Sequence, residues 1–217
     1  MMSMRSLLVI LLSGMSVLAH GATQTNLYEN NFERAELQKL PEDMMLMGGG
    51  FAVAEEGGNK FLELPGAPLE TFGVLFGPTE TNGIGVTARV FGTSKGRRAP
   101  SFGIGFNGVG GYKLQVSPAK KLIELYRGEE LLTSAPWLWE SGSWTMLRLQ
   151  SGITKSGELS VQGKAWKHGT AEPPAWTISY IDKAEAPAGR PSLWGAPYSD
   201  TPIRFDDLKV SAFRINS

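Results

Sequence analysis

Apolar and polar residues alternate over many short stretches of this chain, and glycine- or proline-containing turns separate the stretches. In the stretch 84–91, Ile84, Val86, Ala88 and Val90 fall on one face. A period of two indicates strands with one buried face and one face that is wet or recessed. The pattern predicts strands over residues 27–32, 51–54, 60–64, 72–76, 84–91, 101–106, 112–116, 122–126, 130–133, 144–150, 158–167, 176–181, 192–195 and 203–213.

Helical periodicity is nearly absent from the chain. Residues 34–40, which precede Pro41, have enough of it for one or two turns. Many antiparallel strands without a helical layer must cover one another, which predicts an all-β fold, either a two-sheet sandwich or a barrel. No repeat or linker divides the sequence, so residues 22–217 are expected to form one domain.

The N-terminal segment has the pattern of a secretory signal peptide. Arg5 precedes an apolar run over residues 7–18, and Ala19 and Gly21 supply small residues for cleavage. Ser13 and Gly14 interrupt the run, which is shorter than the roughly 20 apolar residues of a membrane span. We therefore expect residues 1–21 to be removed, and the protein to be secreted or periplasmic without a membrane span.

Composition narrows the chemistry of the exported domain. The chain has no cysteine, which excludes disulfides, thiolate metal sites and a lipoprotein anchor. Without Arg5 the domain has 20 basic and 21 acidic residues, so no overall positive charge would attract nucleic acid or anionic lipid. The expected partner is therefore neutral or is recognised by its shape.

Residues for catalysis are sparse. His168 is the one histidine that remains after cleavage, which excludes a zinc site built on several histidines. A pair of carboxylates spaced along one strand, as retaining glucanases use, is missing, because Glu124, Glu129, Glu130 and Glu158 are isolated or adjacent. The sequence leaves open whether the protein is an enzyme and favours a non-catalytic role.

Aromatic residues provide the best candidates for ligand binding. Lys164 and Trp166 share one face of an expected strand, and Trp137 and Trp139 would share a face if their segment is extended. A planar ring with one hydrogen-bond donor suits the apolar face of a sugar. The candidate ligand-binding residues are these four together with Tyr112.

A structural interpretation of the same segment stays open. Trp166 and Trp176 could pack as a cross-strand pair beside the turn, while Glu172 bonds a loop amide.

Several segments together resemble a known family. They are YENNFE, FAVAEEGGNKFLEL, GVTARVFG, APSFGIGFNGVGGYKLQV, KLIELYRGEELL, GSWTMLRLQ, VQGKAWKHGTAEPPAW and PIRFDDLKV. In this order they resemble the concanavalin A-like lectin/glucanase superfamily, in its laminin G-like and 3-keto-disaccharide hydrolase-like branch. The resemblance implies a jelly roll of two curved antiparallel sheets whose concave face meets carbohydrate in many members. Because other members are catalytic or connect proteins, the fold does not fix the function.

The resemblance also implies that the first and last strands pair. Glu33, together with Glu29, would then lie near Asp206 and Asp207, where related jelly rolls hold a structural calcium ion. Asp206 could equally bond backbone amides or Arg204. No other cofactor is expected.

Three functions follow as hypotheses. The first is an exported, non-catalytic module that binds a glycan, or another extracellular polymer, on the concave face of the jelly roll; the resemblance, the number of tryptophans and the missing carboxylate pair favour it. The second is a glycoside-active hydrolase of the 3-keto-disaccharide type. The third is a structural or protein-contact domain of the cell envelope.

Overall fold

The computed structural model describes residues 23–67, 70–198 and 201–214. The expected signal peptide, residues 1–21, lies outside the described residues. Among the described residues, no helix has the length and apolar character needed to cross a membrane.

Strands make up most of the described chain. A short 3₁₀ helix, η1 (Pro118–Lys120), is the helix among the described residues. The strands are β1 (Thr23–Asn30), β2 (Met45–Leu46), β3 (Ala52–Glu56), β4 (Asn59–Leu64), β5 (Phe72–Leu75), β6 (Ile84–Phe91), β7 (Ser101–Phe106), β8 (Tyr112–Ser117), β9 (Leu122–Arg127), β10 (Glu130–Pro136), β11 (Thr145–Ile153), β12 (Leu159–Lys167), β13 (Ile178–Asp182), β14 (Ser192–Ala196) and β15 (Ile203–Arg214).

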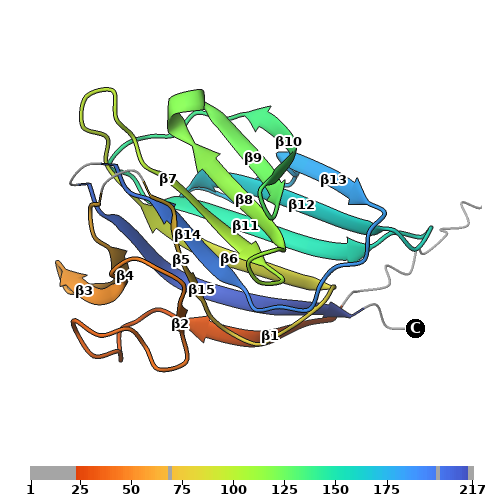
Figure 1. Ribbon diagram of the computed structural model, residues 1–217, viewed down its shortest axis with the longest axis horizontal. Helices are drawn as coiled ribbons and strands as arrows, with labels where there is room; N and C mark the ends of the chain where they lie inside the picture. The colour runs from red at the N-terminus through yellow and green to blue at the C-terminus, as the bar shows by residue number, and fades with distance from the viewer. Residues whose placement is uncertain (1–22, 68–69, 199–200, 215–217) are drawn as a thin grey trace, which may run out of the picture.

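These strands form two antiparallel sheets that stack as a sandwich (Figure 1). The eight-stranded sheet has the order β13-β12-β11-β6-β15-β4-β3, and β1 pairs with β15. The seven-stranded sheet has the order β10-β9-β8-β7-β14-β5-β2. The all-β fold expected from the alternating pattern is thus confirmed, and of its two alternatives the structure is the sandwich and not the barrel. The two-sheet jelly roll that the family resemblance implied is confirmed as well.

The core lies between the inner faces of the two sheets. Ile84, Val86, Ala88 and Val90 of β6 are all fully buried, as the alternation predicted. Phe102, Ile104 and Phe106 of β7, along with alternate residues of the other strands, fill the opposite side of this core. Burying a side chain of this size stabilises the fold by about 1.5–3 kcal/mol.

The chain ends are joined by strand pairing. β1 runs antiparallel to β15, with Glu29 opposite Lys209 and Asn30 opposite Leu208. Figure 1 shows the two strands side by side, red-orange beside blue. The expected pairing of first and last strands is therefore confirmed.

Residues 34–40 form turns and not the short helix that the sequence suggested. Phe32 and Gln38 have φ angles of 59° and 62°, in the left-handed region that interrupts a right-handed helix. The segment is instead bound to β3, because the Gln38 N–H donates to the Val53 carbonyl and the Val53 N–H donates to the Lys39 carbonyl. Tertiary hydrogen bonds outweigh a weak local preference here.

Candidate ligand-binding site

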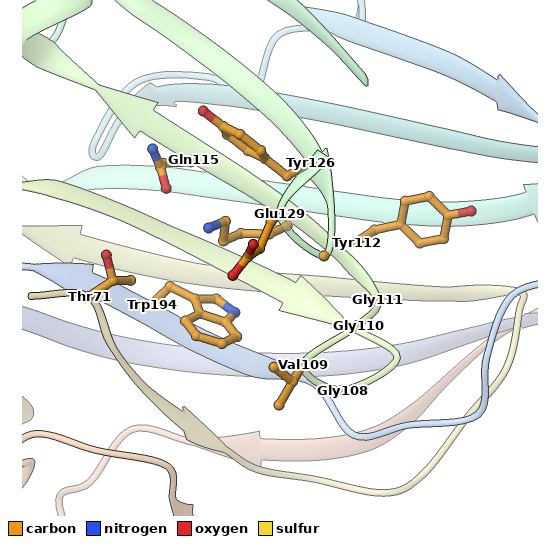
Figure 2. A pocket seen from close by; sticks show the side chains of 12 residues that line it. Thr71, Gly108, Val109, Gly110, Gly111, Tyr112, Gln115, Tyr126, Glu129 and Trp194 are labelled. Atoms are coloured by element: carbon orange, nitrogen blue, oxygen red, sulfur yellow. The ribbon is translucent and has the colours of Figure 1, made fainter. Parts of the chain in front are cut away.

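A hollow of about 590 Å³ opens on the outer face of the seven-stranded sheet. We call it the Trp194 hollow. Its side-chain lining comes from β8, β9, β14 and the adjoining loops, and comprises Thr71, Val109, Lys113, Gln115, Tyr126, Glu129 and Trp194. Figure 2 shows Tyr126 and Trp194 on opposite sides of this hollow, with Gln115 and Thr71 beside them.

Strand alternation explains why β8 contributes to both the core and the hollow. Tyr112, Leu114 and Val116 point inward and are buried, while Lys113 and Gln115 point outward and are half-buried. The register of β8 and β9 puts Tyr126 directly opposite Lys113 on the outer face. The polar residues of β8 therefore form a side wall of the Trp194 hollow.

Two glycines leave space beneath the Trp194 ring, because they have no side chain on the outer face of β5 and β7. A Cβ atom on Gly105 of β7 would lie 2.6 Å from both the Ser192 hydroxyl and the Tyr112 carbonyl oxygen. A Cβ atom on Gly73 of β5 would lie 3.0 Å from the Trp194 ring. The missing side chains leave room for the indole, whose N–H donates to the Ser192 hydroxyl at 2.8 Å.

The Lys113 ammonium lies between the two aromatic rings. Its Nζ is 4.9 Å from the centroid of the Tyr126 ring and 5.4 Å from that of Trp194. The side chain makes no hydrogen bond to any described residue, so its three N–H donors stay available to a ligand. Burial lowers the pKa of Lys113, while the charges of Glu124 and Glu129 act in the opposite direction.

Glu124 is the buried carboxylate nearest to this site on β9. It is 1% exposed, accepts a hydrogen bond from the Ser117 hydroxyl at 2.5 Å and pairs with the Lys120 ammonium at 2.9 Å. Burial raises the pKa of Glu124, but Ser117 and Lys120 outweigh burial and hold it below its ordinary value. An ionised, fully bonded carboxylate is a poor proton donor, so Glu124 is unsuited to act as a general acid.

Two of the tryptophans predicted as ligand-binding residues meet elsewhere. Trp137 and Trp166 line a smaller pocket of about 230 Å³, together with Trp144 and the ion pair of Glu140 and Lys167. We call it the Trp166 pocket. The structure thus brings Trp137 and Trp166 together, away from the Trp194 hollow, and their role in ligand binding stays a prediction.

Trp139 lies apart from the Trp166 pocket. Its ring packs edge-on against Phe102 with centroids 6.0 Å apart, and its buried ring N–H meets no acceptor among the described residues. Trp139 therefore contributes to the edge of the core.

Lys164 is a buried side chain on the outer face of β12. Its ammonium donates to the Pro173 carbonyl at 2.7 Å, pairs with Glu172 at 2.7 Å and lies 4.5 Å from the centroid of the Trp176 ring. Trp176 thus covers Lys164. The structural interpretation of this segment expected Glu172 to bond a loop amide, but in the structure Glu172 pairs with the cations of Lys164 and Arg148. All three contacts hold the loop after β12 on the sheet.

Tyr112 points away from the Trp194 hollow, as Figure 2 shows. Its side chain is 1% exposed, and its hydroxyl donates to Asp182 at 2.6 Å. In this position its hydroxyl stabilises the sandwich, and only its backbone reaches the hollow.

Glu33 and Asp206, the two residues predicted to bind calcium, both accept hydrogen bonds from other residues. Glu33 accepts the backbone N–H of Lys60, whereas Asp206 accepts from Asn59 at 2.9 Å and pairs with Arg89 at 2.6 Å. Calcium requires six to eight oxygen ligands, and a guanidinium beside Asp206 opposes a cation. No group of three or more histidine, cysteine or acidic residues suited to a metal occurs in the described ranges. This donor set fits calcium poorly, and the ion stays an untested prediction.

The sequence prediction missed Trp194, Lys113 and Tyr126. The alternation in 112–116 already placed Lys113 on the outer face, but nothing local indicates what lies across from it. Tyr126 and Trp194 belong to β9 and β14, which only the sheet order β9-β8-β7-β14 brings near one another. This contact depends on the fold and not on sequence spacing.

The comparisons with known proteins support a lectin-like β-sandwich. No protein-family model matches the chain, and no curated protein matches its sequence. Among solved structures, the carbohydrate binding module CBM66 from Bacillus subtilis is similar with a TM-score of 0.55 and 11% identity, over 78% of this chain and 96% of that one.

Two further solved structures have similar folds. A protein of unknown function with a galectin-like fold from Bacillus subtilis has a TM-score of 0.58 and 16% identity, over 90% of this chain and 99% of that one. The marine PL-14 alginate lyase from Aplysia kurodai has a TM-score of 0.56 and 10% identity, over 87% and 99%. At these identities the similarity shows the fold alone, and the fold is shared by a binding module and an enzyme.

Proposed function

We propose that this protein is an exported, non-catalytic carbohydrate-binding module of the concanavalin A-like type, and that the Trp194 hollow is its site. The observation that carries the proposal is the Lys113 ammonium, which has unused donors and lies between the rings of Trp194 and Tyr126. Aromatic rings pack against the C–H faces of sugars, and nearby donors bind the hydroxyl groups.

The size and position of the hollow support this proposal. A volume of about 590 Å³ lies in the range of small-molecule sites. Gln115 and Glu129 add an amide and a carboxylate that can bond hydroxyl groups on either side of Lys113. The similarity to the CBM66 module agrees with a carbohydrate ligand, and the signal-like N-terminal segment agrees with export to the periplasm or the medium.

The ligand-binding test uses purified protein on a glycan array, followed by titration calorimetry with the best glycan. Trp194→Ala and Tyr126→Ala should each weaken binding at least about tenfold, the loss expected when one well-packed aromatic contact is removed. Leu138→Ala is the matched control, because Leu138 lines the Trp166 pocket and is 76% exposed.

Circular dichroism and melting temperature establish that each variant is folded. Retention on no glycan, or unchanged affinity of a folded Trp194→Ala variant, would contradict the proposed site. Loss of binding in Leu138→Ala alone would instead place the ligand at the Trp166 pocket.

The two alternative functions have separate tests. A hydrolase of the 3-keto-disaccharide type would convert plain or oxidised disaccharides, which mass spectrometry detects, and unchanged substrates would count against it. A contact domain of the cell envelope would yield a crosslinked protein partner that still binds after Trp137 and Trp166 are mutated. Glu124, fully bonded and ionised, favours binding over hydrolysis.

A further inference from the structure

The outer face of the eight-stranded sheet, on the other side of the sandwich, has a second recess. Two hollows of about 660 Å³ and 230 Å³ both include Thr87 and Lys209 in their linings, and so adjoin. We call the combined recess the Lys209 groove. Arg34 lines one end, and Arg148 lines the other.

Strand register fixes the order of side chains across the groove. Thr87 of β6 lies directly opposite Lys209 of β15 and directly opposite Arg148 of β11. Directly opposed residues of antiparallel strands place their side chains on the same face. Lys209, Thr87 and Arg148 therefore form one row across three neighbouring strands, and Glu29 of β1 continues it beyond Lys209.

The cations of the groove exceed the carboxylates that remain to balance them. Three cations line the groove, Arg34, Lys209 and Arg148, against three carboxylates, Glu29, Asp207 and Glu172.

Two of these carboxylates already form ion pairs, one of them with Arg89, which also pairs with Asp206. Arg89 pairs with Asp207 at 2.9 Å, and Lys164 pairs with Glu172 at 2.7 Å. Burial raises the pKa of Glu172, but Lys164 and Arg148 outweigh burial and keep this carboxyl group ionised. Arg148 itself pairs with Glu172 at 3.0 Å. Of the three carboxylates in the lining, Glu29 is the one without an ion pair to a described residue, and it opposes the two remaining cations, Arg34 and Lys209.

Two of these cations have no partner among the described residues. The side chains of Lys209 and Arg34 form no hydrogen bond or ion pair with any residue in the ranges 23–67, 70–198 and 201–214. Arg148 lies 5.8 Å from the centroid of the Phe213 ring at the far end, which adds an apolar surface. The groove thus combines unpaired cations, a hydroxyl group at Thr87 and one aromatic ring.

We propose that the Lys209 groove is a second binding site, which takes a saccharide chain carrying anionic groups, carboxylate or sulfate. Lys209 and Arg34 pair with the anionic groups, and Thr87, directly opposite Lys209, bonds a hydroxyl group of the saccharide. The site is independent of the Trp194 hollow, because the two recesses lie on outer faces of different sheets. A net charge near zero for the whole chain conceals this local excess of positive charge.

The test compares polymers that differ only in charge. Polygalacturonate is set against its methyl ester, and dextran sulfate against dextran, with binding to purified protein measured by biolayer interferometry. We expect at least one polyanion to bind at least about tenfold more tightly than its neutral counterpart, and added salt to weaken it. The arm that responds distinguishes carboxylate from sulfate.

Matched variants distinguish the effect of the groove residues on binding from the effect of the protein's overall charge. Arg34→Gln/Lys209→Gln should lower polyanion affinity about tenfold or more, without change in melting temperature, because neither side chain bonds another described residue. Arg97→Gln/Lys155→Gln removes the same charge at exposed positions outside the groove and should bind as the parent does. The proposal is overturned if neither polyanion exceeds its neutral counterpart, or if both double variants lose affinity equally. Trp194→Ala should leave polyanion binding intact, so failure of one site does not imply failure of the other.

Discussion

Glu124 illustrates how a single side chain limits the chemistry of the Trp194 hollow. The sequence offered it as one of several isolated carboxylates, a residue type that is mostly exposed. In the structure it is buried and held by Ser117 and Lys120. Its role is to fix the end of β8 to β9 through the short helix between them. Both of its carboxylate oxygens are occupied by these contacts, so the carboxylate is not available to a ligand.

Glu124 should contribute stability that depends on pH. Because the folded state lowers its pKa, the unfolded chain binds the proton more readily, and the contribution is present above the ordinary value of 4.5. It is lost as pH falls through the lower pKa of the folded state. Glu124→Gln should cost about 1–3 kcal/mol at neutral pH, and the difference from the parent should shrink in acid.

Urea denaturation at neutral pH and at successively lower pH measures this difference. Glu130→Gln is the control, since Glu130 is exposed at the start of β10 and should change the free energy of unfolding by less than about 0.5 kcal/mol. A Glu124→Gln penalty that stays constant with pH would show that the charge is not involved.

At the scale of elements, local alternation was enough to predict most strands, because a half-buried strand carries its signal in its own residues. It failed at β2, whose two residues, Met45 and Leu46, are exposed and are strand only by pairing with β5. It also failed at residues 34–40, where hydrogen bonds to β3 replace a helix.

The two pockets differ in how far apart their residues lie along the chain. The Trp166 pocket joins the neighbouring strands β11 and β12, whereas the Trp194 hollow needs the long connections that insert β14 beside β7. Sequence spacing can indicate contacts between neighbouring strands, as in the Trp166 pocket, but it cannot indicate contacts between strands that are far apart in the sequence, as in the Trp194 hollow.

The flat outer face of β7 should be required for binding. Gly105→Ala would bring Cβ to 2.6 Å from the Tyr112 carbonyl oxygen, a backbone atom that cannot move aside without shifting β8. We expect a loss of about 1–3 kcal/mol in stability and weaker glycan binding, because Trp194 loses its position.

Gly152→Ala in β11 is the matched control for that variant. A Cβ atom there meets no atom within 4 Å, and the unfolded-state effect favours alanine slightly. Thermal melts and glycan titration compare the two variants. Equal stability and equal affinity of both would contradict the close packing inferred at β7.

At the scale of the whole molecule, the sandwich separates two kinds of surface. The seven-stranded sheet carries the aromatic Trp194 hollow, and the eight-stranded sheet carries the cationic Lys209 groove. The core between them is one continuous cluster of apolar residues, among which Leu114 and Leu147 are fully buried. Two ligands can therefore occupy the protein at once without touching.

If both proposed sites operate, one molecule should bridge a neutral glycan and a polyanion. Beads that carry the glycan selected on the array should retain labelled polygalacturonate or dextran sulfate only when the protein is added. Trp194→Ala should strongly reduce retention because the protein binds the beads more weakly, and Arg34→Gln/Lys209→Gln should strongly reduce it because the protein binds the polyanion more weakly. Arg97→Gln/Lys155→Gln should bridge as the parent does. Competition between the two ligands in solution would contradict separate sites, because ligands on opposite faces have no shared contacts through which one could displace the other.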